Sequence, residues 1–330
     1  MRVETNLKTA SKPSEATSKL PMRAHPQMKN VRALVPYAAF ILIFVIFSLV
    51  AFNRFDTLNN FSTIVQQATV LAIVGFGMHF VITMGSIDLS VGSTLGLAGL
   101  IGASASAFSA PAGILVAVGV GGLIGLFNGL VFTFLKVPSF MVSLGTLLIA
   151  RGLTIVYSHS NPIVVADSLM FLGVFPNIVY VAAITCVLCY IAYNHTTFGR
   201  YCIAIGGDER VSSLSGVPLK MIKISVFVVS GLLAGLGGIV TASRLGAATP
   251  TAGTAFELSV ISAVVLGGTP LTGGVGSMQN TVIGAMIIAM LGNGLVILGV
   301  PSEIQQIITG LILISAVFMS LERSKIGIIK

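Results

Sequence analysis

The sequence predicts an all-α integral membrane protein with about ten transmembrane helices. Its mean hydropathy is +1.00, and 55% of its 330 residues are hydrophobic whereas only 8% are charged. The apolar residues come in runs of about 20, the length that a helix needs to cross a bilayer. The runs do not alternate with polar residues, as the strands of a membrane β-barrel do. The 37 glycines suit closely packed membrane helices.

Ten apolar runs have the length of a membrane span. We place them at about residues 34–52, 62–84, 89–109, 112–135, 139–157, 177–193, 222–242, 256–275, 278–298 and 303–321. The run at 256–275 is the weakest, because LGGTPLTGGVGS breaks a regular helix. The alternative there is a re-entrant or unwound stretch, which is tolerated at membrane depth only where protein buries it.

The positions of the basic residues predict the orientation in the membrane. Seven of the 18 Lys and Arg residues lie in 1–32, which we interpret as a cytoplasmic tail. Residues 33–321 are then a single transmembrane domain, and 322–330 form a second cytoplasmic tail. With ten spans, 15 of the 18 basic residues fall on the cytoplasmic side, as the positive-inside rule requires. Orientation thus explains the net charge of +8, and we exclude nucleic-acid binding.

A short sequence motif that occurs twice predicts an inverted structural repeat. NGLVFTFLKVPSF at 128–140 is followed 165 residues later by NGLVILGVPSEI at 293–304. Five predicted spans separate the two copies, so the first VPS faces the cytoplasm and the second faces outside. Many transporters build a central pathway from such inverted repeats.

A polar segment at 199–220 interrupts two very apolar stretches. Six charged residues lie between Arg200 and Lys223. Asp208 follows Gly206-Gly207 and is a good N-cap, and Gly216 with Pro218 is a good stop, which predicts a helix of about seven residues. Since so short a helix is marginal alone, it must be held by the flanking spans and by a partner. The alternative is a solvated surface loop.

Two of the charged residues in or beside the spans are candidates for the pathway. Asp88, in GSIDLSVGS, either caps the third span or contributes to a polar pathway, because a carboxylate at membrane depth is otherwise costly. Arg151 lies about 12 residues, or roughly 18 Å, into the fifth span. It is expected to snorkel outward, to pair with a carboxylate such as Asp167 or Glu257, or to line a pathway, in that order.

Uncharged polar side chains in the spans are further pathway candidates. Amide groups can bind a polar solute, although contacts between helices explain them equally well; these residues are Gln66, Gln67, Asn128 and Asn293. His79 is expected to be a hydrogen-bonded structural residue rather than a proton carrier.

Absent motifs exclude several classes of protein. The chain has no Gly-Lys dipeptide and therefore no P-loop for nucleotide phosphates. It has no HExxH motif and no Cys/His cluster with metal-ligand spacing, which argues against a metalloprotease. Cys186 and Cys189 form a CxxC inside an apolar run, where they are expected to pack as small hydrophobic residues.

Several long motifs resemble one family. The stretch from Gly199 to Phe318 includes GRYCIAIGGDERVSSLSGVPLK and LGNGLVILGVPSEIQQIITGLILISAVF. It is similar to the membrane permeases of bacterial ABC importers for ribose and related monosaccharides. GMHFVITMGSIDLSVGS at 77–93 and ARGLTIVYSHSNPI at 150–163 match the same family. The resemblance extends from about residue 60 to 321, with the motifs in the family's order.

The resemblance implies a role for the segment 199–220. In that family the matching loop is the cytoplasmic coupling segment, whose short helix docks in a groove of the partner ATPase. Here the docking residues would be Gly207, Asp208, Glu209, Arg210, Leu214, Ser215 and Gly216. The family usually has Asn in place of Asp208, an Ala-Ala pair in place of Val211-Ser212-Ser213, and Thr in place of His79. The contacts at 208–213 are therefore expected to be adapted to this chain's own ATPase.

The resemblance also implies a transport function and the partner proteins that it needs. The chain would be the multi-pass permease of an ATP-driven importer for ribose or a related monosaccharide, in the bacterial plasma membrane with both termini cytoplasmic. Its partners would be cytoplasmic ABC ATPase subunits, a second permease copy or related chain, and an extracytoplasmic sugar-binding protein. The permease would be no enzyme and would bind no cofactor, because the partner subunit uses the ATP.

Without the resemblance, the residues alone leave two other functions to consider. A secondary transporter or facilitator of a polar solute needs charged groups deep in its spans to bind H⁺ or Na⁺, and only Arg151, Asp88 and His79 qualify. An intramembrane enzyme needs a nucleophile and a base, and the sequence has no recognisable pair.

Overall fold

The computed structural model describes residues 26–320, with the side chains of 34–318. The predicted tail at 322–330 and most of the tail at 1–32 lie outside the described residues. The first half of the chain forms α1 (Pro26–Val50), α2 (Leu58–Thr83), α3 (Val91–Ser106), α4 (Ala110–Phe134), α5 (Ser139–Ser158), the strand β1 (Ile163–Val164), the 3-10 helix η1 (Asp167–Leu172) and α6 (Asn177–His195).

The second half begins with two short helices and continues with long ones. It forms α7 (Thr197–Gly207), α8 (Glu209–Leu214), α9 (Leu219–Leu245), the strand β2 (Ala247–Ala248), α10 (Phe256–Leu266), α11 (Met278–Ile297) and α12 (Ser302–Ser320). The two-residue strands β1 and β2 pair antiparallel.

The all-α membrane fold is confirmed. Within residues 26–320, each of the ten predicted spans contains a helix. Six of these helices, α2, α4, α5, α6, α9 and α11, are long and apolar enough to cross a membrane by length and composition. The other four are shorter apolar helices over the stretches whose side chains are described.

The predicted span at 256–275 is wrong beyond Leu266. Helix α10 has only 11 residues, and the connection to α11 is irregular. Three glycines in it have positive φ, at Gly268 (90°), Gly273 (76°) and Gly274 (77°), a backbone region that only glycine enters freely. The unwound alternative is therefore what the structure contains.

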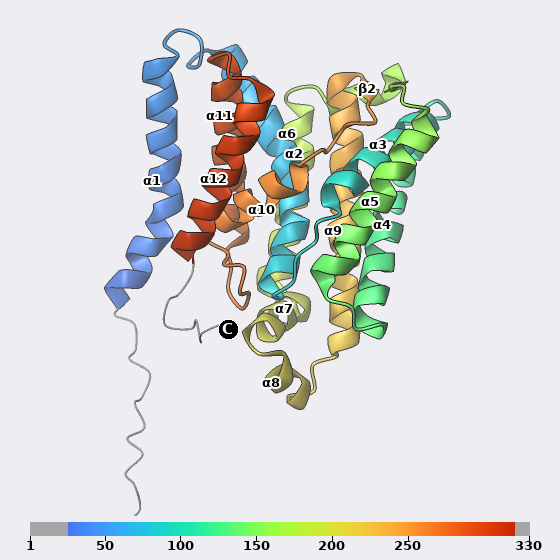
Figure 1. Cartoon of the computed structure of the whole chain (residues 1–330), viewed down its shortest axis with the longest axis vertical. Coiled ribbons are helices and arrows are strands. Elements are labelled where there is room, and N and C mark those ends of the chain that lie inside the picture. Colours follow the sequence, from blue (N-terminus) through green and yellow to red (C-terminus); the bar gives the residue numbers. More distant parts are fainter. Residues whose placement is uncertain (1–25, 321–330) are drawn as a thin grey trace, which may run out of the picture.

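Helix α2 lies at the centre of the bundle. Its residues from Ala68 to Thr83 are all buried, as expected for a helix that is apolar on every side. Figure 1 shows α1, α11 and α12 on one side of it and α3, α4, α5 and α9 on the other. Glycines bring the neighbouring helices close; a methyl group at Gly121 of α4 would overlap the carbonyl oxygen of Gly231 in α9.

Two helices begin at mid-depth. Helix α9 has 27 residues and is about 40 Å long. Asp88 lies just before α3 and is hydrogen-bonded to Ser230, about 17 Å along α9. Since Gly99 of α3 packs on Gly238 further along α9, α3 starts near the middle of α9 and runs alongside its second half.

The start of α10 lies at the same level. A methyl group at Gly92 in α3 would overlap a side-chain oxygen of Glu257 in α10 and lie 2.5 Å from the carbonyl oxygen of Gly253. The starts of α3 and α10 are also 165 residues apart, as are Asn128 and Asn293. This agrees with the predicted inverted repeat, which stays a prediction.

The two ends of the bundle differ. Helices α7 and α8 lie at one end, beyond the end of α2, whereas β2 lies at the opposite end (Figure 1). The first described turn of α1 and the last of α12 point to the end that carries α7 and α8. The described chain thus enters and leaves on the side of the segment 199–220.

Candidate functional site: the coupling segment and the polar groups of the bundle

Residues 199–220, which we term the coupling segment after the role that the resemblance predicts, contain the predicted short helix. Helix α8 has six residues, and the Asp208 carboxylate caps it by accepting a 2.9 Å hydrogen bond from the Val211 amide. At its other end the Gly216 backbone has a φ of 80°, and the Val217 amide donates to the Ser212 carbonyl at 3.1 Å. Such a left-handed glycine is a common helix stop.

One face of α8 is anchored and the other is exposed. Ser212 is buried, while Glu209, Arg210, Val211, Leu214 and Ser215 are exposed. The exposed fraction of Leu214 is 83%, on a helix that projects from the end of the bundle (Figure 1). Val211 is also exposed, at 57%, and lies three residues from Leu214, so the two apolar side chains are neighbours on one face of the helix.

Lys223 of α9 holds α8 in place. Its Nζ donates to Glu209 Oε1 at 2.7 Å and lies 4.8 Å from the centre of the Phe132 ring of α4. The Lys223 side chain is only 14% exposed. The salt bridge therefore ties α8 to the ends of two long helices at once.

Backbone contacts join the coupling segment to the core at a site that we term the glycine joint, made of Gly85, Gly206, Gly273 and Gly274. The Gly274 amide donates to the Thr83 carbonyl at 2.8 Å. A methyl group at Gly206 would overlap that same carbonyl oxygen and lie 2.5 Å from the Gly274 nitrogen. The end of α7 thus touches the end of α2 and the loop after α10 without side chains between them.

His79 lies in a buried polar cluster near this joint. Its Nδ1 is 3.1 Å from Thr281 Oγ1 and 3.2 Å from Thr269 Oγ1, and its ring packs on Tyr193 with 4.7 Å between ring centres. His79 is fully buried and connects α2, α6, α11 and the loop after α10. This geometry favours the structural interpretation of His79.

Asp88 does not cap α3, so that interpretation was wrong. The N-cap residue of α3 is Ser90. The Asp88 carboxylate instead accepts hydrogen bonds from the Ser90 amide at 3.0 Å, from Ser90 Oγ at 2.6 Å and from Ser230 Oγ at 2.8 Å. It has no cationic partner among the described residues, and it links the start of α3 to α9.

Asn128 extends the Asp88 network across two more helices. Its side-chain amide donates to Ser90 Oγ at 2.9 Å, and its carbonyl oxygen accepts from Thr146 Oγ1 at 2.6 Å. Asn128 and Asp88 are both buried. Four helices therefore meet through one satisfied polar network, in which Ser90, Thr146 and Ser230 were not predicted because Ser and Thr carry no distinctive sequence signal.

Replacing Asp88 by alanine is expected to destabilise the bundle. The change leaves the hydroxyls of Ser90 and Ser230 and the Ser90 amide without their acceptor, and each buried donor left unpaired costs about 1–3 kcal/mol. We expect a clear fall in the melting temperature of the detergent-purified protein. The exposed Asp167 provides the control, since Asp167→Ala should melt like the wild type; equal melting of both variants would show that the network contributes no stability.

Arg151 does not snorkel outward in the structure. Its Nη1 donates to the Ala252 carbonyl at 2.8 Å and to that of Pro250 at 3.4 Å, in the turns that lead to α10. No ion pair joins it to Glu257 or Asp167 among the described residues, although Arg151 and Glu257 interact electrostatically. Both side chains are partly exposed at mid-depth, whereas Glu257 Oε2 is shielded.

The other pathway candidates lie apart from Arg151. Gln66, near the start of α2, donates to Ser62 Oγ at 3.2 Å, and Gln67 beside it is partly buried. Asn293 in α11 is buried, and its Oδ1 has no hydrogen-bond partner among the described residues. The structure thus unites Asp88 with Asn128 and leaves Gln66, Gln67 and Asn293 separate.

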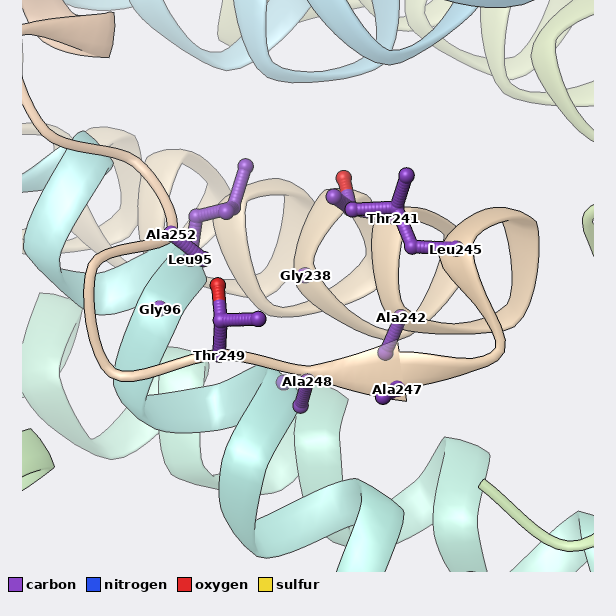
Figure 2. A pocket seen from close by; sticks show the side chains of 11 residues that line it. Leu95, Gly96, Gly238, Thr241, Ala242, Leu245, Ala247, Ala248, Thr249 and Ala252 are labelled. Carbon is purple, nitrogen blue, oxygen red and sulfur yellow. The ribbon is translucent and has the colours of Figure 1, made fainter. Parts of the chain in front are cut away.

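A narrow pocket lies beside the turns that follow β2. Figure 2 shows it between α9 with Gly238 and Thr241, α3 with Leu95 and Gly96, and the strand β2 with the residues after it. Its volume is about 10 Å³, the space of a single water molecule. A monosaccharide does not fit there in this conformation.

Comparisons with known proteins agree on the kind of molecule. A family model described as branched-chain amino acid transport system / permease component matches residues 60–317. The ribose import permease protein of Escherichia coli is 40% identical over 81% of this chain and 87% of its own. The D-allose transport system permease protein of the same organism is 35% identical over 84% and 87%. Its xylose transport system permease protein is 30% identical over 88% and 92%. No solved structure matches the chain.

Proposed function

Because the chain belongs to the family of branched-chain amino acid transport system permease components, and within it to the ribose-type ABC importer permeases, we propose that it forms the pathway for ribose or a related monosaccharide. It is a multi-pass inner-membrane protein. The observation that supports the sugar is the similarity, along more than four fifths of the chain, to permeases named for ribose, allose and xylose.

The coupling segment supports dependence on a separate ATPase. A helix of six residues cannot persist alone, yet α8 is capped, anchored by Lys223 and left with Leu214 exposed. We assign ATPase docking to Gly207, Asp208, Glu209, Arg210, Leu214, Ser215 and Gly216. The permease then binds no cofactor, and the partner consumes the ATP on the cytoplasmic side, together with both termini.

The glycine joint supports a route from the ATPase to the pathway. Movement of α7 would act directly on the end of α2, which leads to α3, and on the loop after α10. Helices α3 and α10 meet at mid-depth, so one displacement at the joint reaches both. A two-state change of this kind lets ATP and loaded binding protein favour different states of one element.

The pathway requires a second permease copy. Arg151 and Glu257 are partly exposed at membrane depth, where lipid is a costly neighbour for charged side chains. A second copy, identical or related, would cover this face and enclose water. We place Arg151 on the pathway and assign to Asp88 and Asn128 the support of its wall from within the bundle. Further pathway candidates lie nearer the end of the bundle opposite α8, where the sugar-binding protein would dock; these are Gln66, Gln67 and Asn293.

Uptake under two energetic conditions tests the proposal and separates it from secondary transport. Labelled ribose, allose and xylose are offered to cells that depend on this chain for uptake. We expect uptake of at least one sugar to persist when a protonophore collapses the ion gradients while ATP is maintained, and to stop when ATP is depleted. Uptake that follows the gradient instead of ATP would establish a secondary transporter.

A further inference from the structure

A polar segment of consecutive turns, residues 249–255, crosses the bundle to the start of α10 at mid-depth. In Figure 1 it descends from β2 toward the short helix α10. Thr251 and Thr254 in this segment are exposed, and the Gly253 carbonyl lies against Gly92 of α3. The segment therefore belongs to the level at which α3 and α10 begin.

Lipid cannot be the neighbour of this segment. Unpaired backbone groups and hydroxyls cost several kcal/mol in hydrocarbon, so irregular backbone at this depth occurs where protein buries it or where it lines a water-filled cavity. Thr251 and Thr254 are not buried by the described residues. Thr254 Oγ1 donates to the Thr251 carbonyl at 2.7 Å, and a hydroxyl that donates in this way can still accept a hydrogen bond. With a second copy enclosing water over this face, as proposed above, the surface beside them lines that water.

Donors and acceptors of opposite charge converge on this surface. The hydrogen bonds of Arg151 to the segment come from Nη1 alone, and a guanidinium has five N–H donors. Glu257, in the first turn of α10, is partly exposed, while its shielded Oε2 faces α3 and has no hydrogen-bond partner among the described residues. Gly92 makes room for that carboxylate, since a methyl group there would overlap it.

We propose that Glu257, with Arg151 and the hydroxyls of Thr251 and Thr254, forms a contact site for the hydroxyl groups of the translocated monosaccharide. A neutral sugar presents adjacent hydroxyls that both donate and accept, so a guanidinium beside a carboxylate suits it. The few direct contacts suit a pathway that must also release its cargo. The inference rests on the proposed function, because it names the groups that the sugar meets there.

The substitution Glu257→Gln tests the acceptor while it keeps the shape of the side chain. We expect initial rates of ribose, allose and xylose uptake to fall by about tenfold or more, because a hydrogen bond to a charged group contributes about 1.5–3 kcal/mol. The fall should be unequal among the sugars, whereas the membrane level and the co-purified ATPase stay unchanged. Glu303, in the first turn of α12 and exposed, provides the matched control, and Glu303→Gln should transport like the wild type.

Cysteine accessibility supplies a readout that a structural role of Glu257 would not change. Thr251→Cys and Thr254→Cys should react with a membrane-impermeant thiol reagent, and ribose should slow the reaction. Leu42→Cys, on the exposed apolar face of α1, should not react, and the wild type with its own three cysteines sets the background.

Three results have distinct meanings. Wild-type cells that import none of the three sugars would refute the proposed function itself. Normal wild-type transport with an unchanged Glu257→Gln rate would refute the contact site alone. Unreactive cysteines at 251 and 254 would also refute it, because the surface would then be dry.

Discussion

Replacing Asp208, Glu209 and Arg210 together by alanine is expected to abolish ATP-driven sugar uptake and co-purification of the ATPase. The change removes the N-cap of α8, which is worth about 1 kcal/mol, and the salt bridge from Glu209 to Lys223. A helix of six residues cannot absorb both losses, because nucleating a helix is costly. We expect Leu214 to lose its fixed position and the ATPase its contact.

Single substitutions separate the helix cap from the charge. Asn caps helices about as well as Asp, so Asp208→Asn should keep α8 folded and retain most of the uptake, whereas Asp208→Ala should lose much of it. Leu214→Ala leaves the cap and the salt bridge intact and should weaken ATPase binding alone. Measurements are uptake at matched membrane levels and the amount of ATPase retained on the tagged permease. Full uptake by the triple variant would falsify the docking role.

Local sequence patterns were sufficient to predict the long helices and the short helix α8. Runs of about 20 apolar residues mark helices because the bilayer fixes their length. Asp208 and Gly216 delimit α8 because a cap and a left-handed glycine are chemical requirements of neighbouring residues. The mid-depth starts of α3 and α10 were missed, since the polar stretches that precede them are short beside the apolar runs.

The partners of the buried polar groups could not be predicted from the sequence, because these partners are distant along the chain. Asp88 and Ser230 are 142 residues apart, and Arg151 and Ala252 are 101 apart. Nothing near Asp88 in the chain distinguishes a helix cap from a network across four helices, because both need the same carboxylate. Likewise the partner of Arg151 is a backbone carbonyl, which every residue carries and which no sequence motif marks.

Two adjacent glycines provide the sharpest test of how the coupling segment acts on the bundle. A methyl group at Gly206 would overlap the Thr83 carbonyl oxygen, whereas one at Gly207 would meet no atom within 4 Å. Both residues lie in the last turn of α7. The intrinsic gain in helix propensity on changing Gly to Ala, about 1 kcal/mol, is therefore similar at the two positions, and only the contact differs.

We expect Gly206→Ala to lower sugar uptake by about tenfold or more. Gly207 can take part in docking only through its backbone, and a methyl group there meets no atom of the permease within 4 Å, so Gly207→Ala should keep the ATPase bound and leave uptake near the wild-type rate. At Gly206 the methyl group pushes α7 away from the end of α2 and from the Gly274 amide, at a packing cost of about 1–3 kcal/mol. The helix α8 and its exposed face are untouched, so the ATPase should still bind. If α7 no longer contacts the end of α2 at the glycine joint, ATP hydrolysis should continue without sugar uptake.

The measurements are ATPase co-purification, ATP hydrolysis by the reconstituted complex, and sugar uptake in cells. Loss of the ATPase from Gly206→Ala would mean that the joint positions α8 rather than transmitting its movement. Equal uptake by Gly206→Ala and Gly207→Ala would mean that the backbone contact at Thr83 is no part of the coupling route. Because the two variants share one helix turn and one chemical change, a difference between them isolates the contact of α7 with α2 and the loop after α10.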